Sequence, residues 1–314
     1  MIKAVCRNIG IWLIAGVVLV GCQSTTPTVP ESGDIRTIEH AKGTSQVSKT
    51  PRRVVVLDTA PLDAAIALGI KPVGTIVYGQ LPEYLGDKVN DITTVGDGNQ
   101  PNLEAILQLN PDLILGSKPG TEKLYTQLSQ IAPTVLAEDS GRAGDWPEHF
   151  RLYAEALGRS EQAEQLLQSY QEQVETFRQQ LDQQAAMEIS LLSSYDNKIG
   201  AYTTGSFPGS VLQDIGFARN STQDITRRYA LRLSQEALTE LDGDFIFLIY
   251  SSHFSGMIKK EEFMTDPIWS QLNAVQQDRV CEVPNEVWIA GRSILAAQQI
   301  LTDVGECLNL EGLN

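Results

Sequence analysis

The longest regular pattern in the chain lies between Ser160 and Gln184. Apolar residues recur there at spacings of three and four, as expected of an amphipathic helix with one buried stripe: Ala163, Leu166, Leu167, Tyr170, Val174, Phe177 and Leu181. Ser160 suits the N-cap, and no glycine or proline interrupts the segment. A helix of about 25 residues is roughly 37 Å long, which is enough to connect two lobes.

A sequence repeat supports this interpretation. Residues 102–115 read NLEAILQLNPDLIL and residues 234–247 read SQEALTELDGDFIF, so that Glu104 aligns with Glu236 and Asp112 with Asp244. Each copy predicts a capped helix, a turn containing proline or glycine, and a short apolar strand. Because the copies lie on opposite sides of the long helix, the sequence predicts one such unit in each of two lobes.

The remaining pattern is an alternation of short strands and helices. A hairpin is expected over residues 35–47, turning near Lys42-Gly43, and strand–helix units follow on both sides of the long helix. The predicted fold is α/β, with two lobes that contain central, largely parallel sheets and are joined by one long interdomain helix. We expect an N-terminal lobe over residues 35–145, connecting helices over 146–185, and a C-terminal lobe over 186–314.

The N-terminus has the features of an export signal. Lys3 and Arg7 precede an apolar run over residues 9–21, which is too short for a membrane span but suits a signal peptide. The run ends in Leu-Val-Gly-Cys22, which resembles the bacterial lipobox, although a plain signal anchor is the alternative. We therefore expect residues 1–21 to be removed and Cys22 to carry lipid. Residues 22–34 would form a flexible tether, and the protein would be attached to a membrane on the periplasmic or cell-surface side.

Charge and cysteine content narrow the possible functions. The whole chain has a net charge of −15, and removing residues 1–21 takes away Lys3 and Arg7 but no acid, so the mature chain carries −17. Such a charge argues against nucleic acid as a partner. Cys281 and Cys307 remain after processing and, in an oxidising compartment, favour a disulfide over two unrelated buried thiols.

Several motifs, in order, resemble one known family. The segments TPRRVVVLDTAPLDAAIALGIKPVG, PNLEAILQLNPDLILG, YTQLSQIAPTV, EALGRSEQAEQLL and LSQEALTELDGDFIFL are similar to the periplasmic-binding proteins of iron–siderophore ABC importers, over roughly residues 35–310. The family includes ferrichrome-, ferric-citrate- and cobalamin-binding members. The resemblance implies a class III periplasmic-binding-protein fold and a ferric siderophore held between the lobes. It also implies delivery to an ABC permease; we further expect a monomer without a cofactor.

Glu104 and Glu236 have two interpretations. An acid in the first turn of a helix is common, because it gains about 0.3–1 kcal/mol from the helix dipole. In the family that the chain resembles, however, a surface glutamate on each lobe docks onto arginines of the permease. The resemblance therefore assigns Glu104 and Glu236 to permease docking.

The ligand site is expected where loops follow the strands and face the cleft between the lobes. Arginines suit the anionic oxygens of a siderophore and aromatic rings suit its apolar rim. Trp146 and Trp288 fit a core position equally well. The candidate ligand contacts are Tyr78, Lys118, Arg142, Trp146, Tyr195, Arg227, Arg228, Tyr250, His253, Trp288 and Arg292. Residues 219–232 also hold Arg219 and Arg232, and at least one arginine of this run is expected to face the ligand.

Other functions find less support in the sequence. Three histidines, His40, His149 and His253, are too few and too scattered for a His-rich metal site, so no metal site is expected. Haem or cobalamin remains an alternative ligand. An exported hydrolase is the alternative from another class, but there is no G-x-S-x-G elbow, P-loop, H-E-x-x-H or C-x-x-C motif. We expect no enzymatic activity. A structural or adhesive lipoprotein would have no cleft.

Overall fold

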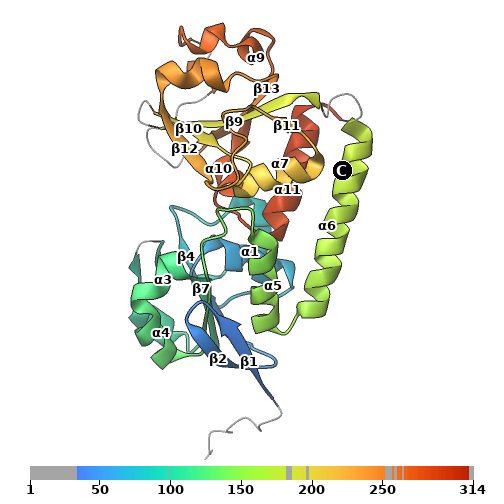
Figure 1. The fold of residues 1–314 in the computed structure, drawn as a ribbon. Coiled ribbons are helices and arrows are strands. Elements are labelled where there is room, and N and C mark those ends of the chain that lie inside the picture. The colour runs from blue at the N-terminus through green and yellow to red at the C-terminus, as the bar shows by residue number, and fades with distance from the viewer. Residues whose placement is uncertain are drawn as a thin grey trace, which may run out of the picture.

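The computed structural model describes residues 34–98, 100–181, 186–195, 198–251, 257, 260–263 and 265–310. Two sheets of six strands each form two lobes, and the long helix α6 (Ser160–Leu181) runs along one side of the molecule past both (Figure 1). The predicted two-lobed α/β fold is confirmed. None of the described helices is both long and apolar enough to cross a bilayer. The expected signal peptide, tether and lipidated Cys22 lie outside the described residues.

The N-terminal lobe is built on a sheet with the order β6-β5-β4-β3-β7-β8, in which all pairs except β5 with β6 are parallel. Its strands are β3 (Val54–Val56), β4 (Gly74–Val77), β5 (Thr93–Asp97), β6 (Gln100–Pro101), β7 (Leu113–Ser117) and β8 (Thr134–Ala137). The predicted hairpin is confirmed as β1 (Ile35–His40) and β2 (Gly43–Ser48). The helices of this lobe are α1 (Thr59–Ala67), η1 (Glu83–Val89), α2 (Leu103–Gln108), α3 (Lys118–Thr121), η2 (Glu122–Leu124), α4 (Tyr125–Ile131) and α5 (Trp146–Leu157).

The C-terminal lobe has the order β12-β10-β9-β13-β14, with the short β11 beside β9. β13 is parallel to β9 and β14, whereas β10 is antiparallel to β9 and β12. The strands are β9 (Glu188–Tyr195), β10 (Lys198–Tyr202), β11 (Ala218–Arg219), β12 (Ala230–Ser234), β13 (Phe245–Tyr250) and β14 (Val280–Pro284). The helices are α7 (Phe207–Ile215), η4 (Gln235–Leu241), α8 (Lys260–Phe263), η5 (Trp269–Gln271), α9 (Asn273–Gln276), α10 (Asn285–Trp288) and α11 (Ile294–Cys307).

The two copies of the repeat share one structural role but differ in their helices. Asp112 accepts hydrogen bonds from the backbone N–H groups of Arg52 and Arg53 at the start of β3, and Asp244 accepts one from Glu188 at the start of β9. Each aspartate thus ties its own strand to the neighbouring one.

The prediction of a capped helix in both copies was half wrong. Asn102 caps the α-helix α2 through the N–H of Ala105, but the second copy forms the 3-10 helix η4, to which Ser234 makes no cap bond. The hydroxyl of Ser234 bonds the Glu236 carboxylate instead, which lowers the pKa of Glu236. The backbone N–H groups at the start of η4 therefore receive no hydrogen bond from Ser234, and the segment forms the tighter turns of a 3-10 helix.

The turn between α5 and α6 fixes the direction of the long helix. Gly158 ends α5 with φ of 73°, and a Cβ on this residue would lie 2.5 Å from the carbonyl oxygen of Lys49. Only glycine fits such a position without strain. α6 then buries a stripe of residues at alternating spacings of three and four, as predicted: Ala163, Leu167, Tyr170, Val174, Phe177 and Leu181.

One hydrophobic core joins the two lobes. It includes Val54 and Val56 from the first sheet and Phe247 and Ile249 from the second, together with the buried faces of α1, α5, α6, α7 and α11. Two smaller clusters cover the outer faces of the sheets, around Ile114 in the first lobe and Leu248 in the second. Because the larger core is continuous, the lobes cannot separate without exposing it to water.

A disulfide closes the C-terminal lobe. Cys281 on β14 is bonded to Cys307 at the end of α11, with the two Cα atoms 5.8 Å apart, a separation usual for this bond. The bond attaches the last helix to the edge strand of the second sheet.

Candidate ligand-binding cleft

A cleft of about 570 Å³ lies where the second sheet meets the loop between β8 and α5. Its floor follows from the two-residue period of strand β10. Ile199 and Ala201 point into the core, so Lys198, Gly200 and Tyr202 face the opposite side. Gly200 is opposite Ser193 on β9 and Arg232 on β12. A Cβ on Gly200 would lie 2.6 Å from the Ser193 hydroxyl, so glycine keeps the floor open.

The first lobe contributes one wall through the β8–α5 loop. The carbonyl oxygen of Arg142 accepts a hydrogen bond of 2.9 Å from the N–H of Phe207, and Ala143 forms an isolated bridge with Ser206. These contacts hold the loop against the N-terminus of α7, so the Arg142 side chain enters a cleft formed mainly by the second lobe. The remaining apolar or small lining residues are Ile199, Pro208, Ala230, Leu231, Met257 and Ile289.

Positive charge and tyrosine rings distinguish the cleft. Arg142, Lys198 and Arg232 line it, and within the described part of the chain none of their side chains forms an ion pair or hydrogen bond. Three unpaired cations in one cleft are notable in a chain of net charge −15. Among the described residues, no aspartate, glutamate, histidine or cysteine lines the cleft. The cleft therefore suits an anionic ligand better than a bare metal ion.

The tyrosines supply the contact area. Tyr195 and Tyr229 line the cleft and are 50% and 46% exposed, which leaves their rings free to pack on a ligand. Tyr202 lies deeper, and burial raises the pKa of its phenol, so the hydroxyl stays protonated. Rings of this kind pack on apolar surface while their hydroxyl groups donate hydrogen bonds.

The structure brings only part of the predicted ligand set together. Arg142 and Tyr195 lie in the cleft, and Arg232 is the member of the 219–232 arginine run that enters it. Tyr78 lines a neighbouring pocket of about 40 Å³, which shares Asn285 with the cleft. Burial and the nearby Asp58 carboxylate raise the pKa of Tyr78 to about 12.

Other predicted ligand contacts lie elsewhere. Lys118 pairs with Glu138 at 2.5 Å on the exposed surface of the first lobe. Arg227 and Arg228 are exposed on the loop before β12 but do not line the cleft, and Tyr250, at the end of β13, does not line it either. His253 lies outside the described residues. The buried Arg219 donates to the carbonyl oxygen of Tyr202, and burial lowers its pKa to about 10.

Both predicted tryptophans lie in the core, which is the alternative that the sequence left open for them. Trp146 is 1% exposed and packs edge-on against Tyr170 and Phe207 in the shared core. Trp288 is fully buried, stacks near Phe247, and donates its indole N–H to Asp303 at 2.7 Å. Their large apolar area stabilises the core and is not available to a ligand.

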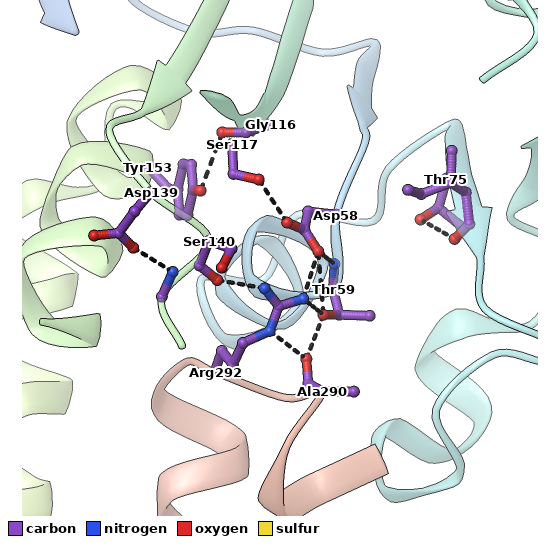
Figure 2. Close-up of polar contacts among 12 residues, drawn as sticks. Asp58, Thr59, Thr75, Gly116, Ser117, Asp139, Ser140, Tyr153, Ala290 and Arg292 are labelled. Carbon is purple, nitrogen blue, oxygen red and sulfur yellow. Dashed lines mark hydrogen bonds and ion pairs between the residues drawn. The ribbon is translucent and has the colours of Figure 1, made fainter. Parts of the chain in front are cut away.

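Arg292, another predicted ligand contact, is bonded within the protein and lies outside the cleft lining. Arg292 is 4% exposed, and its guanidinium bonds Asp58 at 2.6 Å, Thr59 at 2.6 Å and the carbonyl oxygen of Ser140 (Figure 2). The hydroxyl of Ser117 donates to the other oxygen of Asp58 at 2.7 Å. Burial alone would raise the pKa of Asp58, but the Arg292 charge and the Ser117 hydrogen bond bring it below its ordinary value. Arg292 thus joins the lobes through a buried ion pair.

A second buried carboxylate joins the same elements. Asp63 on α1 accepts hydrogen bonds from the N–H groups of Leu295 and Ala296, at 3.0 and 2.9 Å, and from the hydroxyl of Tyr84. It therefore caps the N-terminus of α11 from the other lobe. Together, Asp58 and Asp63 fix the position of the lobes on which the shape of the cleft depends.

Sequence reasoning missed Lys198, Tyr202 and Tyr229 as cleft residues. The available signal was the alternation Lys198-x-Gly200-x-Tyr202 within one strand. The predicted permease-docking residues, Glu104 and Glu236, are both exposed in the first turns of α2 and η4.

Comparison with known proteins agrees with this architecture. The family model for periplasmic binding proteins matches residues 54–287. A probable siderophore-binding lipoprotein of Bacillus subtilis, YfiY, is 32% identical over 94% of this chain and 95% of its own length. The achromobactin-binding periplasmic protein of Dickeya dadantii is 31% identical over 83% of this chain and 88% of its own.

A solved structure is similar in both sequence and fold. Staphylococcus aureus SirA, complexed with staphyloferrin B, is 30% identical to this chain and superposes with a TM-score of 0.76. The match covers 88% of this chain and 99% of SirA. With its two lobes, its connecting helix and the cleft at their junction, the chain belongs to the periplasmic binding protein family.

Proposed function

We propose that this protein binds an anionic ferric siderophore in the cleft and delivers it to an ABC importer. The observation that carries the proposal is a set of three cations, Arg142, Lys198 and Arg232, that face one space. Within the part of the chain that the structure describes, they have no ion-pair partner and no acidic residue lines this space. The ligand is then a complex whose metal is already chelated and whose outer oxygens are negative. Carboxylate and catecholate complexes meet this description, and neutral hydroxamates do not.

The arrangement of the side chains supports ligand capture. The guanidinium groups of Arg142 and Arg232 suit bidentate contacts with carboxylates, and the exposed rings of Tyr195 and Tyr229 suit the apolar rim of the complex. The names of the related proteins refer to siderophore binding, achromobactin and staphyloferrin B. The described lining residues include no nucleophile paired with a general base, which supports a role in binding rather than in catalysis.

Delivery would use the outer surface of the lobes. The exposed Glu104 and Glu236, one on each lobe, would contact arginines of the permease, and lipid on Cys22 would keep the protein outside the cytoplasm beside its importer. Because a connected core fixes the distance between the lobes, the two glutamates would act as a two-point contact. A monomer without a cofactor is sufficient for this role.

A fluorescence titration tests the proposal. The purified protein, with four tryptophans and nine tyrosines, is titrated with ferric citrate, ferric staphyloferrin B, a ferric catecholate and a neutral ferric hydroxamate. We expect quenching by an anionic complex and none by the neutral one. Arg142→Ala and Arg232→Ala should each weaken binding at least about tenfold, because a desolvated ionic contact is lost.

The matched control is Arg227→Ala, which removes the same charge from an exposed position outside the cleft. It should leave the affinity unchanged. Equal losses in all three variants would mean that only the overall charge matters and that the cleft is misassigned. If haem or cobalamin bound saturably and no ferric siderophore caused quenching, the ligand would not be a siderophore and the proposal would be refuted.

A further inference from the structure

A cluster of one histidine and two aspartates lies beside the cleft and takes no part in the function proposed above. Asp139 and Asp145 lie in the β8–α5 loop, and His149 lies in the first turn of α5. The His149 side chain is 9% exposed, whereas those of Asp139 and Asp145 are 44% and 38% exposed. The cluster is therefore closed on the protein side by the imidazole and accessible from solvent past the carboxylates.

The distances from the histidine to the two carboxyl groups are longer than hydrogen bonds. His149 Nε2 lies 3.6 Å from Asp139 Oδ1 and 3.6 Å from Asp145 Oδ2, beyond the usual 2.7–3.2 Å. Two ligands of a tetrahedral ion with bonds of about 2.0–2.1 Å are separated by about 3.4 Å. The imidazole nitrogen is therefore spaced from each of the two oxygens as one ligand is from another around a small ion, and the ligand atoms of all three residues lie within 4.8 Å of one another.

One side chain of the cluster is held in position by a hydrogen bond, and two polar atoms of the others lack a hydrogen-bond partner among the described residues. Asp139 Oδ1 is oriented by the N–H of Gly141 at 2.7 Å, the kind of support that metal ligands receive. His149 Nδ1 and Asp145 Oδ1, which are not the atoms facing each other, are buried and have no hydrogen-bond partner among the described residues, so no bond through these atoms holds either side chain in another orientation. The carboxyl groups of Asp139 and Asp145 lie close together, and a cation between them would offset the repulsion of two negative charges.

We propose that Asp139, Asp145 and His149 bind a divalent transition-metal ion of the Zn²⁺ class, separate from the iron of the cargo. The ligands are Asp139 Oδ1, Asp145 Oδ2 and His149 Nε2, and water takes the fourth position on the solvent side. An imidazole with two carboxylates suits Zn²⁺ better than Ca²⁺ or Mg²⁺, which need six or more oxygen ligands. The sequence argued only against a His-rich metal site, and a site with one imidazole and two carboxylates is of a different kind.

The ion would act on the ligand-binding loop. Asp139 and Asp145 lie on either side of Arg142, and His149 belongs to the rigid helix α5. A metal that binds all three would close this segment into a short loop anchored on α5. It would thereby restrict the position from which Arg142 enters the cleft.

The test uses tag-free, chelator-treated protein titrated with Co²⁺, whose visible absorption reports tetrahedral coordination. We expect one equivalent of Co²⁺ to produce a visible band that Zn²⁺ abolishes. His149→Gln and Asp139→Asn should each weaken Co²⁺ binding by at least about tenfold to a hundredfold, since even supporting residues have effects of that size. No band in the wild-type protein would overturn the proposal.

Two controls and a second readout separate the site from chance binding and from misfolding. His40→Gln removes an unrelated imidazole, and Glu148→Gln removes an exposed carboxylate next to His149; both should retain the band. Zn²⁺ should raise the melting temperature of the wild-type protein and of these controls, but not that of the well-folded variant Asp145→Asn. An equal rise in Asp145→Asn would place the metal elsewhere and refute the assignment.

Discussion

The buried ion pair between Asp58 and Arg292 makes a sharp prediction for stability. Replacing Asp58 with Asn removes the negative charge from a pair in which both side chains are 4% exposed and leaves the Arg292 guanidinium without its counter-ion. Breaking a buried pair from one side costs about 3–5 kcal/mol, because the remaining charge stays desolvated. We therefore expect Asp58→Asn to lower the free energy of unfolding by this amount.

The assay is equilibrium urea denaturation followed by circular dichroism, with the disulfide kept oxidised. Arg292→Met should destabilise similarly, since it leaves the Asp58 carboxylate buried. The double variant Asp58→Asn with Arg292→Met should lose clearly less than the sum of the two single losses, because it leaves no unpaired charge.

The matched control is an ion pair on the surface. Arg151 bonds Glu164 at 2.8 Å, but the two side chains are 47% and 58% exposed. Arg151→Met should therefore change the free energy of unfolding by no more than about 1 kcal/mol. If Asp58→Asn were as mild as Arg151→Met, or if the double variant showed additive losses, the ion pair would not be what holds the lobes together.

Three further predictions concern titration, the disulfide and delivery. Because burial raises the pKa of Asp63 to about 6, the folded state binds a proton more tightly than the unfolded state. Wild-type stability relative to Asp63→Asn should then rise by up to about 3 kcal/mol as pH falls from about 7 to about 4 in urea titrations; a constant difference would contradict this. Replacing Cys281 and Cys307 with alanine should cost about 3 kcal/mol for a loop of 26 residues, and an unchanged urea midpoint would exclude a stabilising bond. Glu104→Arg with Glu236→Arg should bind siderophore normally yet fail in vesicle uptake, and wild-type transport would refute docking.

Most of the fold was predictable because its signals are local. The stripe along α6 and the Lys42-Gly43 turn each depend on neighbouring residues, and each was placed correctly. Strands β5 and β12 were missed. β5 reads TTVGD and has one buried apolar residue, Val95, while the alternation in β12, which reads ALRLS, extends over only five residues and leaves no residue fully buried.

The cleft was harder to predict because its residues meet only through tertiary structure. β10 presents Lys198 and Tyr202 to the cleft because β12 pairs with it, and without β12 the sequence does not show which face of β10 is open. Residue type alone assigns Arg292 to an anionic ligand. Its actual partner, Asp58, is 234 positions away, and no local pattern connects them.

The position of α11 has a consequence for how the chain acquires its structure. The helix packs against α1 and α5 of the first lobe as well as α6 and α7, although it is formed by the last described residues (Figure 1). When the chain is synthesised from its N-terminus, α11 is therefore the last element to join the core that it shares with the first lobe. Contacts between such distant segments slow folding and leave apolar surface open meanwhile. A chain that stops before Ile294 would lack α11, and the apolar surface of the first lobe that α11 covers would stay exposed to water. Proteases should then cleave the first lobe as well as the second.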